Sequence, residues 1–176
     1  AADLLVSDWP EAHRRLPEVS AARGGRWRNE SAPYLRGIMD ATVERDVRQI
    51  AIVKSAQVGA SEALLNIVLY HVHARPCPML MVLPTASAAG AWSKERLADA
   101  LRSIPELRAL VSDKRAPASE GRPESTLSLK MFPAGFLRLG GGNSPNSYAR
   151  WSVRLAIADD CDRIPRFIGA EGDATQ

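Results

Sequence analysis

The chain has few cysteines: its 176 residues include only Cys77 and Cys161. Two thiols cannot build a disulfide framework or a cysteine-rich zinc site, and such scarcity is typical of a reducing cytosol. His71 and His73 lie two residues apart on an expected helix, so their side chains point in different directions and are not expected to share a metal ion. The shortage argues against a disulfide-stabilised secreted domain and against a zinc protein.

Long hydrophobic runs are also missing from the sequence. No segment reaches the roughly 20 apolar residues that a membrane-spanning helix needs, and no N-terminal segment has the apolar core of a signal peptide. Hydrophobic residues make up 45% of the chain and charged residues 24%, as in an ordinary globular domain with one core. We expect a soluble intracellular protein that has no membrane as a partner.

Charge of neither sign dominates, because 23 basic and 20 acidic residues leave a net charge of +3. So small an excess permits contact with nucleic acid without requiring it. Lysine itself is scarce, and most of the basic residues are arginines. One of the few lysines, Lys54, directly follows an apolar run. This makes it a candidate for a specific role, although lysine is also tolerated at the end of a strand.

Residues 49–66 combine an apolar run, a loop of small residues and an amphipathic segment. Their periodicity predicts a strand over 49–53, a loop over 54–60 and a helix from Ser61 to about His73 that buries one broad face. This is the layout of a phosphate-binding loop, in which backbone N–H groups and a helix N-terminus surround an anion. A strand, a turn and a helix also form a common structural unit that binds nothing.

The pattern G-x-x-x-x-G-K-[ST] fits this loop only in part. Lys54 stands at the first glycine, Gly59 at the second and Ser61 at the hydroxyl position. Ala60 stands where the lysine belongs, so a lysine is present only at the front edge of the loop. The motif is degenerate, and its residues alone leave open whether it is rearranged or decayed.

A second signal lies further along the chain, where residues 154–158 predict a strand that ends in Asp159 and Asp160. Nucleotide hydrolases place one acid there to hold hydrated Mg²⁺ and a neighbouring acid to orient the attacking water. Open α/β sheets bind ligands at the carboxyl ends of their strands, where both carboxylates would stand. A strand that runs into an ordinary acidic turn is the alternative for this motif by itself. Two such signals in this order favour a nucleotide site.

The rest of the chain alternates helical and strand-like segments. Such alternation predicts an α/β fold with a mainly parallel sheet and helices on both faces. The further elements predicted are an arginine-bearing arm or short helix over 1–30, a helix from Ser31, its cap, to about Thr42, an interior parallel strand over 78–84, a helix over 87–102, a turn over 105–110, an exposed loop over 112–125, hairpin strands over 126–132 and 135–139, and a loop over 140–145.

With these residues in place, the chain resembles the ATPase domain of phage terminase large subunits of the lambda (GpA) type, from about residue 27 to the C-terminus. The matching segments are Trp27 with 33–40, 54–62, 83–86, 93–97, 132–136, 142–145 and 157–165. A lysine at the first position of the loop is itself typical of that family. The resemblance implies a P-loop NTPase fold of the RecA/ASCE-like kind, with an N-terminal arm over 1–30 and the ATPase domain over 31–176.

The resemblance also implies an ATP-hydrolysing motor domain that drives double-stranded DNA into a viral procapsid. Its partners would be DNA, the terminase small subunit, the portal and procapsid, and further copies of the chain in a ring, all in the host cytoplasm. The nuclease domain of such proteins is expected to be absent from this chain, which ends at Gln176, before the downstream coupling motif.

The resemblance carries residue roles over one at a time. The loop residues that would bind ATP are Lys54, Ser55, Ala56, Gln57, Val58, Gly59, Ala60 and Ser61. Lys54 would serve the β- and γ-phosphates, Ser61 and Asp159 would hold Mg²⁺, and Asp160 would orient the water. The region that contacts the adenine in this family contains Trp27, Pro33 and Tyr34, for which packing in the core is the alternative interpretation.

Two positions depart from the family's pattern. The water-orienting acid is usually Glu, and Asp160 is one methylene shorter, so slow hydrolysis is expected. Gln57 stands where some relatives carry an arginine finger, and Arg150 or another arginine is the candidate to replace it. There are two alternatives to a packaging motor. One is a helicase-like DNA-dependent ATPase. The other is a catalytically impaired nucleotide-binding module, in which residues such as Ala60 and Asp160 are expected at these positions.

Overall fold

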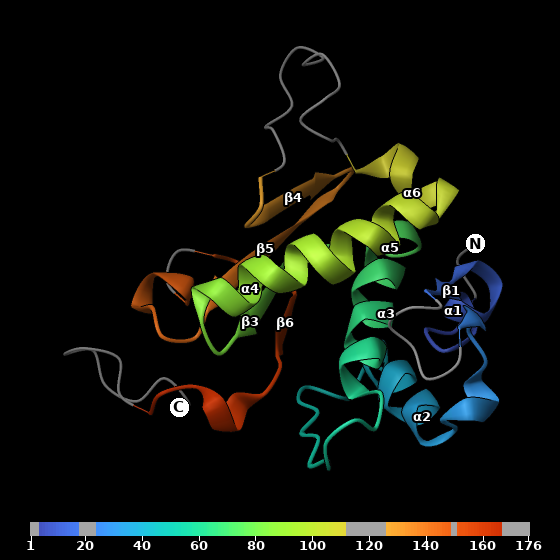
Figure 1. The fold of residues 1–176 in the computed structure, drawn as a ribbon, viewed down its shortest axis with the longest axis horizontal. Helices are drawn as coiled ribbons and strands as arrows, with labels where there is room; N and C mark the ends of the chain where they lie inside the picture. Colours follow the sequence, from blue (N-terminus) through green and yellow to red (C-terminus); the bar gives the residue numbers. More distant parts are fainter. Residues whose placement is uncertain (1–3, 18–23, 112–125, 149–150, 167–176) are drawn as a thin grey trace. The chain divides into compact units, whose positions relative to one another are not determined.

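The computed structural model describes residues 4–17, 24–111, 126–148 and 151–166 (Figure 1). The chain forms two compact units, Ala1–Arg75 and Pro76–Gln176. The exposed loop expected over 112–125 and the candidate arginine finger Arg150 lie outside the described residues. Within the described ranges, no helix combines the length and the apolar character that crossing a bilayer requires.

The first unit is built around the helix α3 (Ala60–His73). Its further elements are α1 (Asp8–His13), the strands β1 (Arg15–Leu16) and β2 (Gly25–Arg26), the 3-10 helix η1 (Asn29–Ser31) and α2 (Tyr34–Ala41). Both α1 and α2 pack against α3, and β1 pairs with β2 in an antiparallel ribbon. The helix predicted from Ser61 is confirmed. It is buried on nearly all sides rather than on one face, because every residue from Leu65 to Val72 is enclosed.

The N-terminal segment, expected as an arm or short helix over 1–30, contains α1 and is held on the helices that follow it. The backbone N–H and the hydroxyl of Ser7 both donate to the carboxylate of Asp40, at 2.8 and 2.9 Å. Trp9 is 1% exposed, and its Nε1 donates to Nδ1 of His73 at 2.9 Å. These contacts attach residues at the start of the chain to both α2 and α3. The division into an arm and an ATPase domain at residue 30 stays a prediction.

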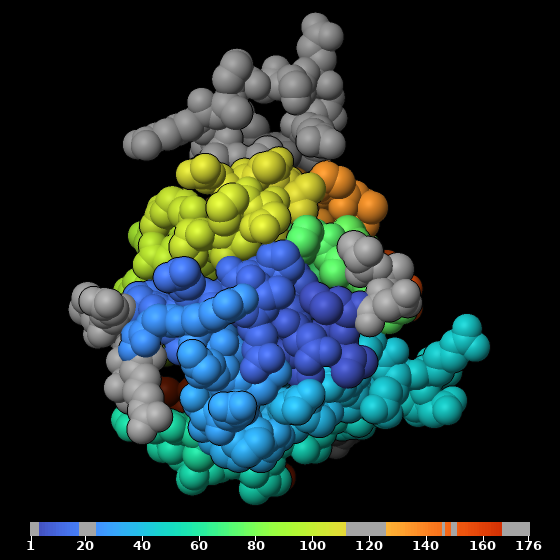
Figure 2. All heavy atoms as spheres, turned by 90° about the vertical axis from the view of Figure 1, so that its right-hand side faces the viewer, coloured from blue at the N-terminus to red at the C-terminus, as the bar shows by residue number. Residues whose placement is uncertain are grey.

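The strand predicted over 49–53 is wrong. Residues 47–55 form neither helix nor strand, and no strand in the described part of the chain pairs with them. Val53 is fully exposed, and in Figure 2 the cyan spheres of this segment stand out from the rest of the first unit. An apolar run becomes a strand only where a neighbouring strand completes its hydrogen bonds. The described part of the first unit offers only the short β1–β2 ribbon.

The second unit contains a four-stranded sheet in the order β4-β5-β3-β6. Its strands are β3 (Met79–Leu83), β4 (Leu129–Phe132), β5 (Gly135–Gly141) and β6 (Leu155–Ala158). β3 is buried along its whole length and pairs in parallel with both β5 and β6, which confirms the predicted interior parallel strand. β4 and β5 form the predicted antiparallel hairpin, with Ala134 at the turn in a left-handed conformation (φ 61°), although β4 begins only at Leu129 and β5 continues to Gly141, into the loop predicted over 140–145.

Helical segments connect β3 to the hairpin. They are α4 (Ala86–Trp92), a π-helical turn (Ser93–Leu97), α5 (Ala98–Ser103) and α6 (Pro105–Leu110), and the first three run on as one rod (Figure 1). The helix predicted over 87–102 is therefore confirmed, but it has a π turn in its middle. The turn begins at Ser93, whose side chain is fully buried and donates to the carbonyl of Leu127 at 2.7 Å.

The two faces of the sheet meet different segments. Glycine is required at Gly141 because a Cβ there would collide with the backbone at the start of α4, so this face lies against the helix. On the opposite face, Leu80 and Val82 form a cluster with Ile164, and Val153 packs against it. The second unit is thus a mixed α/β structure with a mostly parallel sheet, as predicted at this level of detail.

Candidate functional site

The loop that precedes α3 ends in a glycine whose conformation the helix requires. Gly59 has a left-handed backbone (φ 78°), and its carbonyl accepts hydrogen bonds from the N–H groups of Glu62 (3.1 Å) and Ala63 (3.0 Å). Only glycine adopts this conformation without strain from a Cβ. The helix therefore begins where the sequence predicted, and the Gly59 carbonyl is the first acceptor of its backbone hydrogen bonds.

The loop itself is exposed over residues 54–57. Gln57 also has a left-handed backbone (φ 58°), which no sequence pattern indicated. The hydroxyl of Tyr34 donates to the carbonyl of Val58 at 2.9 Å. Leu35 lies under the end of the loop, since its Cδ1 is 3.3 Å from the position that a Cβ on Gly59 would occupy. The first turn of α2 thus supports the loop from one side.

The three residues expected near an adenine lie in different surroundings. Trp27 is 6% exposed, its Nε1 donates to Oδ1 of Asn29 at 2.9 Å, and the Arg14 guanidinium lies 5.6 Å above its ring. Pro33 is exposed and directly precedes α2, so Ser31 is not the cap that the sequence predicted. Tyr34 is 57% exposed beside the loop. Of the three, Tyr34 is the one that the structure brings to the loop.

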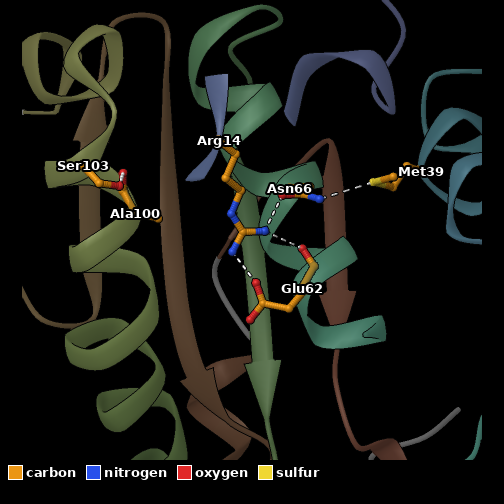
Figure 3. Close-up of polar contacts among 6 residues, drawn as sticks. All are labelled: Arg14, Met39, Glu62, Asn66, Ala100 and Ser103. Atoms are coloured by element: carbon orange, nitrogen blue, oxygen red, sulfur yellow. Dashed lines mark hydrogen bonds and ion pairs between the residues drawn. The ribbon is translucent and has the colours of Figure 1, made fainter. Parts of the chain in front are cut away.

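Arg14 is a buried cation in the first unit, and its side chain contacts residues of α3 (Figure 3). Its Nη2 pairs with the carboxylate of Glu62, and its Nη1 donates to the side-chain oxygen of Asn66 and to the carbonyl of Glu62 at 3.2 Å. The side-chain amide of Asn66 in turn donates to the sulfur of Met39 at 3.7 Å. Sequence reasoning missed this network, because Arg14 is one of several arginines in a polar segment and no local pattern distinguishes it.

In the second unit, the predicted acids do follow the end of a parallel strand, β6, of which Ile157 is the buried residue. The N–H of Asp159 donates to the carbonyl of Val82 at 3.1 Å, so this residue still lies beside β3. Asp159 is 6% exposed. The next residue, Asp160, has a left-handed backbone (φ 51°), and its N–H donates to Oδ1 of Asp159 at 3.1 Å. Its carboxylate lies 3.7 Å from Nη1 of Arg163 in the 3-10 helix η4 (Cys161–Arg163).

The carboxyl ends of three parallel strands meet at this edge. Thr85 follows β3 and caps α4 by accepting from the N–H of Ala88 at 3.1 Å. Gly142 follows β5 and donates to the carbonyl of Leu83 at 2.6 Å. The hydroxyl of Tyr148 donates to the Gly142 carbonyl at 3.2 Å, and burial raises the pKa of that phenol, with a smaller contribution from Cys161. Asp159 and Asp160 therefore lie at the edge where open α/β sheets bind ligands.

The two groups of predicted site residues belong to different units. The first unit carries the loop, with the half-buried residue Ser61 in the first turn of α3. The second unit carries the two carboxylates. Hydroxyl and carboxylate oxygens are the ligands that Mg²⁺ accepts, so the residues present fit this ion chemically. Their union in one site stays a prediction.

Comparison with known proteins identifies a family whose model spans both the loop before α3 and the acidic pair after β6. The family model described as "Phage terminase large subunit gpA, ATPase domain" matches residues 21–176. The chain is 34% identical over 171 residues to the "Terminase, large subunit" of Escherichia phage lambda, a match that covers 96% of this chain and 25% of that protein. It is 30% identical over 175 residues to the protein of the same name from Enterobacteria phage P21, covering 98% of this chain and 26% of that protein.

The chain spans about a quarter of the length of these curated relatives. No solved structure matches it significantly. The family model covers the loop, α3 and the acidic edge of the sheet together. The chain belongs to the family of phage terminase large subunit gpA ATPase domains.

Proposed function

We propose that this chain is the ATP-hydrolysing domain of a viral DNA-packaging motor, and that hydrolysis drives double-stranded DNA into a procapsid. The observation that carries the proposal is the acidic pair at the carboxyl edge of the parallel sheet, in a chain that belongs to a terminase ATPase-domain family. A buried acid followed by a more exposed one suits a division of labour between holding a metal ion and orienting water.

Each predicted residue has a chemical task in this proposal. Lys54 donates to oxygens of the β- and γ-phosphates, and the backbone N–H groups of residues 55–60 surround them. Ser61 and Asp159 hold Mg²⁺, which when bound neutralises charge on the phosphate oxygens. Asp160 accepts a hydrogen bond from the attacking water and orients it. Arg150 remains the candidate for an arginine finger.

The partners follow from the family rather than from any contact in the structure. Membership of the terminase large-subunit family supports double-stranded DNA as the cargo, and the small subunit, the portal and further copies of the chain in a ring as protein partners. The matching family model is that of the ATPase domain, so we expect no DNA cleavage by this chain. The host cytoplasm is the compartment in which such a motor would act.

ATP turnover, measured without DNA, with double-stranded DNA and with single-stranded DNA, separates this proposal from its two alternatives. A packaging ATPase domain has slow basal hydrolysis. A helicase-like enzyme is stimulated strongly by single-stranded DNA. An impaired module binds ATP without turnover. Asp159→Asn should weaken nucleotide binding only when Mg²⁺ is present, and the proposal is contradicted if the unmodified chain neither binds nor hydrolyses ATP.

DNA binding is measured against salt in the same preparation. Contacts with phosphates release counterions, so the affinity should be weak and should fall steeply as salt rises. Tight binding that does not depend on salt, or DNA cleavage in Mg²⁺ or Mn²⁺, would contradict this part of the proposal.

A further inference from the structure

Glu62 carries a negative charge at a place where the proposed function requires an anion to bind. It is the third residue of α3, in the turn that directly follows the loop, and its side chain is 31% exposed. A carboxylate in the first turn stabilises a helix through the helix dipole. The same N-terminus would receive the phosphates of ATP, and two anions at one helix end repel each other.

Arg14 supplies the opposite charge from a different part of the chain. Its side chain is 5% exposed and pairs with the Glu62 carboxylate (Figure 3). The guanidinium is held in place by further contacts, with the side chain of Asn66 and with the ring of Trp27 at 5.6 Å. A planar guanidinium that has several partners keeps one orientation, which a lysine ammonium in its place would not.

The contacts of Arg14 also reach the backbone of the loop. Nη1 of Arg14 donates to the carbonyl of Glu62 at 3.2 Å. The N–H of the same residue, Glu62, donates to the carbonyl of Gly59 at 3.1 Å, which closes the left-handed end of the loop. Glu62 is therefore held through its carboxylate and its carbonyl while its N–H holds the glycine. Ser61, the proposed magnesium ligand, lies between Gly59 and Glu62.

We propose that Arg14 is a positioning residue for the phosphate-binding loop: it neutralises the Glu62 carboxylate at the phosphate-receiving end of α3 and fixes the turn that closes the loop. This inference rests on the proposed function, because it names a determinant of the same site. It places a residue of the N-terminal segment among the groups that set nucleotide affinity.

Affinities for ATP, ADP and adenosine in wild type, Arg14→Met and Glu62→Gln test the electrostatic part. Arg14→Met should weaken ATP binding about tenfold more than adenosine binding, with ADP between them, because an uncompensated carboxylate acts on each phosphate charge. Glu62→Gln, which keeps a side chain able to accept from Arg14, should bind ATP a few-fold more tightly and leave adenosine unchanged. Arg14→Met combined with Glu62→Gln should restore the wild-type ratio of ATP to adenosine affinity.

Arg102→Met is the matched control, because Arg102 pairs with Asp99 on the exposed surface of the other unit and should change none of the three affinities. Equal weakening of all three ligands in Arg14→Met, or no recovery in the double variant, would overturn the electrostatic role.

Hydrogen exchange, measured without nucleotide, tests whether Arg14 fixes the turn that closes the loop. The amides of Glu62 and Ala63 should exchange about tenfold faster in Arg14→Met than in Arg102→Met, since both donate to Gly59. Arg14→Lys should give an intermediate rate. Unchanged exchange at these two amides would overturn the inference while ATP binding by the wild type still supported the proposed function. If the wild type binds no adenine nucleotide, the proposed function fails, and the exchange rates alone still decide whether Arg14 fixes the loop.

Discussion

The two segments that would form the nucleotide site are held in different ways. In the second unit, Asp159 extends a parallel ladder and is 6% exposed beside β3. In the first unit, residues 54–57 are exposed and form neither helix nor strand. The acid is therefore positioned by the hydrogen bonds of a sheet. The loop depends on the first turn of α3 and on a few side-chain contacts, so distant side chains should affect it more.

The largest effect is expected at the sheet edge. Asp160→Asn should lower ATP turnover about 10³-fold while nucleotide binding stays close to wild type, because a neutral amide cannot orient and polarise water as a carboxylate does. Asn also tolerates the left-handed backbone found at this position (φ 51°), so the variant should fold normally. Turnover and affinity measured together check this, and a variant that still hydrolyses Mg-ATP at the wild-type rate would contradict the role of Asp160.

A slightly smaller loss is expected in the loop. Lys54→Ala should reduce turnover about 10²-fold, because removal of one charged group leaves developing charge on the phosphoryl oxygens unstabilised. Since Lys54 is exposed and belongs to no helix or strand, circular dichroism should be unchanged. Nearly normal turnover would show that the front-edge lysine does not replace the one missing at Ala60.

Crowding the backbone tests how rigid the sheet edge is. A Cβ on Gly142 would lie 2.8 Å from both Cγ atoms of Ile164, the residue that follows η4 and Asp160. Gly142→Ala should therefore cost about 2 kcal/mol of stability, the usual cost of overpacking, and should lower the melting temperature. Adding Ile164→Ala removes the crowded atoms. The double variant should be less destabilised than the sum of the two single changes, and simple additivity would argue against this contact.

The smallest effect is expected from the contact between α2 and the loop. Tyr34→Phe removes only the hydrogen bond to the carbonyl of Val58, which is exposed to solvent. Its loss should cost about 0.5 kcal/mol, so the melting temperature should hardly change. If Tyr34 stacks on a base as the resemblance implies, Phe should also keep the affinity for ATP, whereas Tyr34→Ala should lower it. Equal affinity in both variants would place the adenine elsewhere.

Several features could be predicted from the sequence because they depend on local pattern. α3, the interior strand β3, the β4–β5 hairpin and the acids after β6 all formed where periodicity and turn residues placed them. α3 and β3 are buried along nearly their whole length, and β4 and β5 complete each other's backbone hydrogen bonds. The family assignment rested on short motifs in the right order, and the matching family model bears it out.

The strand predicted over 49–53 failed for the opposite reason. Its residues have the composition of a strand, but hydrogen-bonding partners for a strand must come from elsewhere in the fold. In the described part of the chain none pairs with it, and Val53 is fully exposed. The residues of a segment set its strand propensity, but whether a strand forms depends on neighbouring strands that can pair with it.

The amino-acid sequence by itself determined the family, most of the elements and the two acidic residues, because local pattern and motif order carry that information. Only the tertiary structure decided that Arg14 is a buried partner of Glu62, that Trp27 is covered by that arginine, and that Asp160 has a left-handed backbone. An Asp adopts the left-handed conformation more readily than a Glu, which gives a physical reason why position 160 carries Asp and not the Glu that is usual in the family. These features depend on which distant residues meet, and a charge or an aromatic ring in the sequence does not specify its partner.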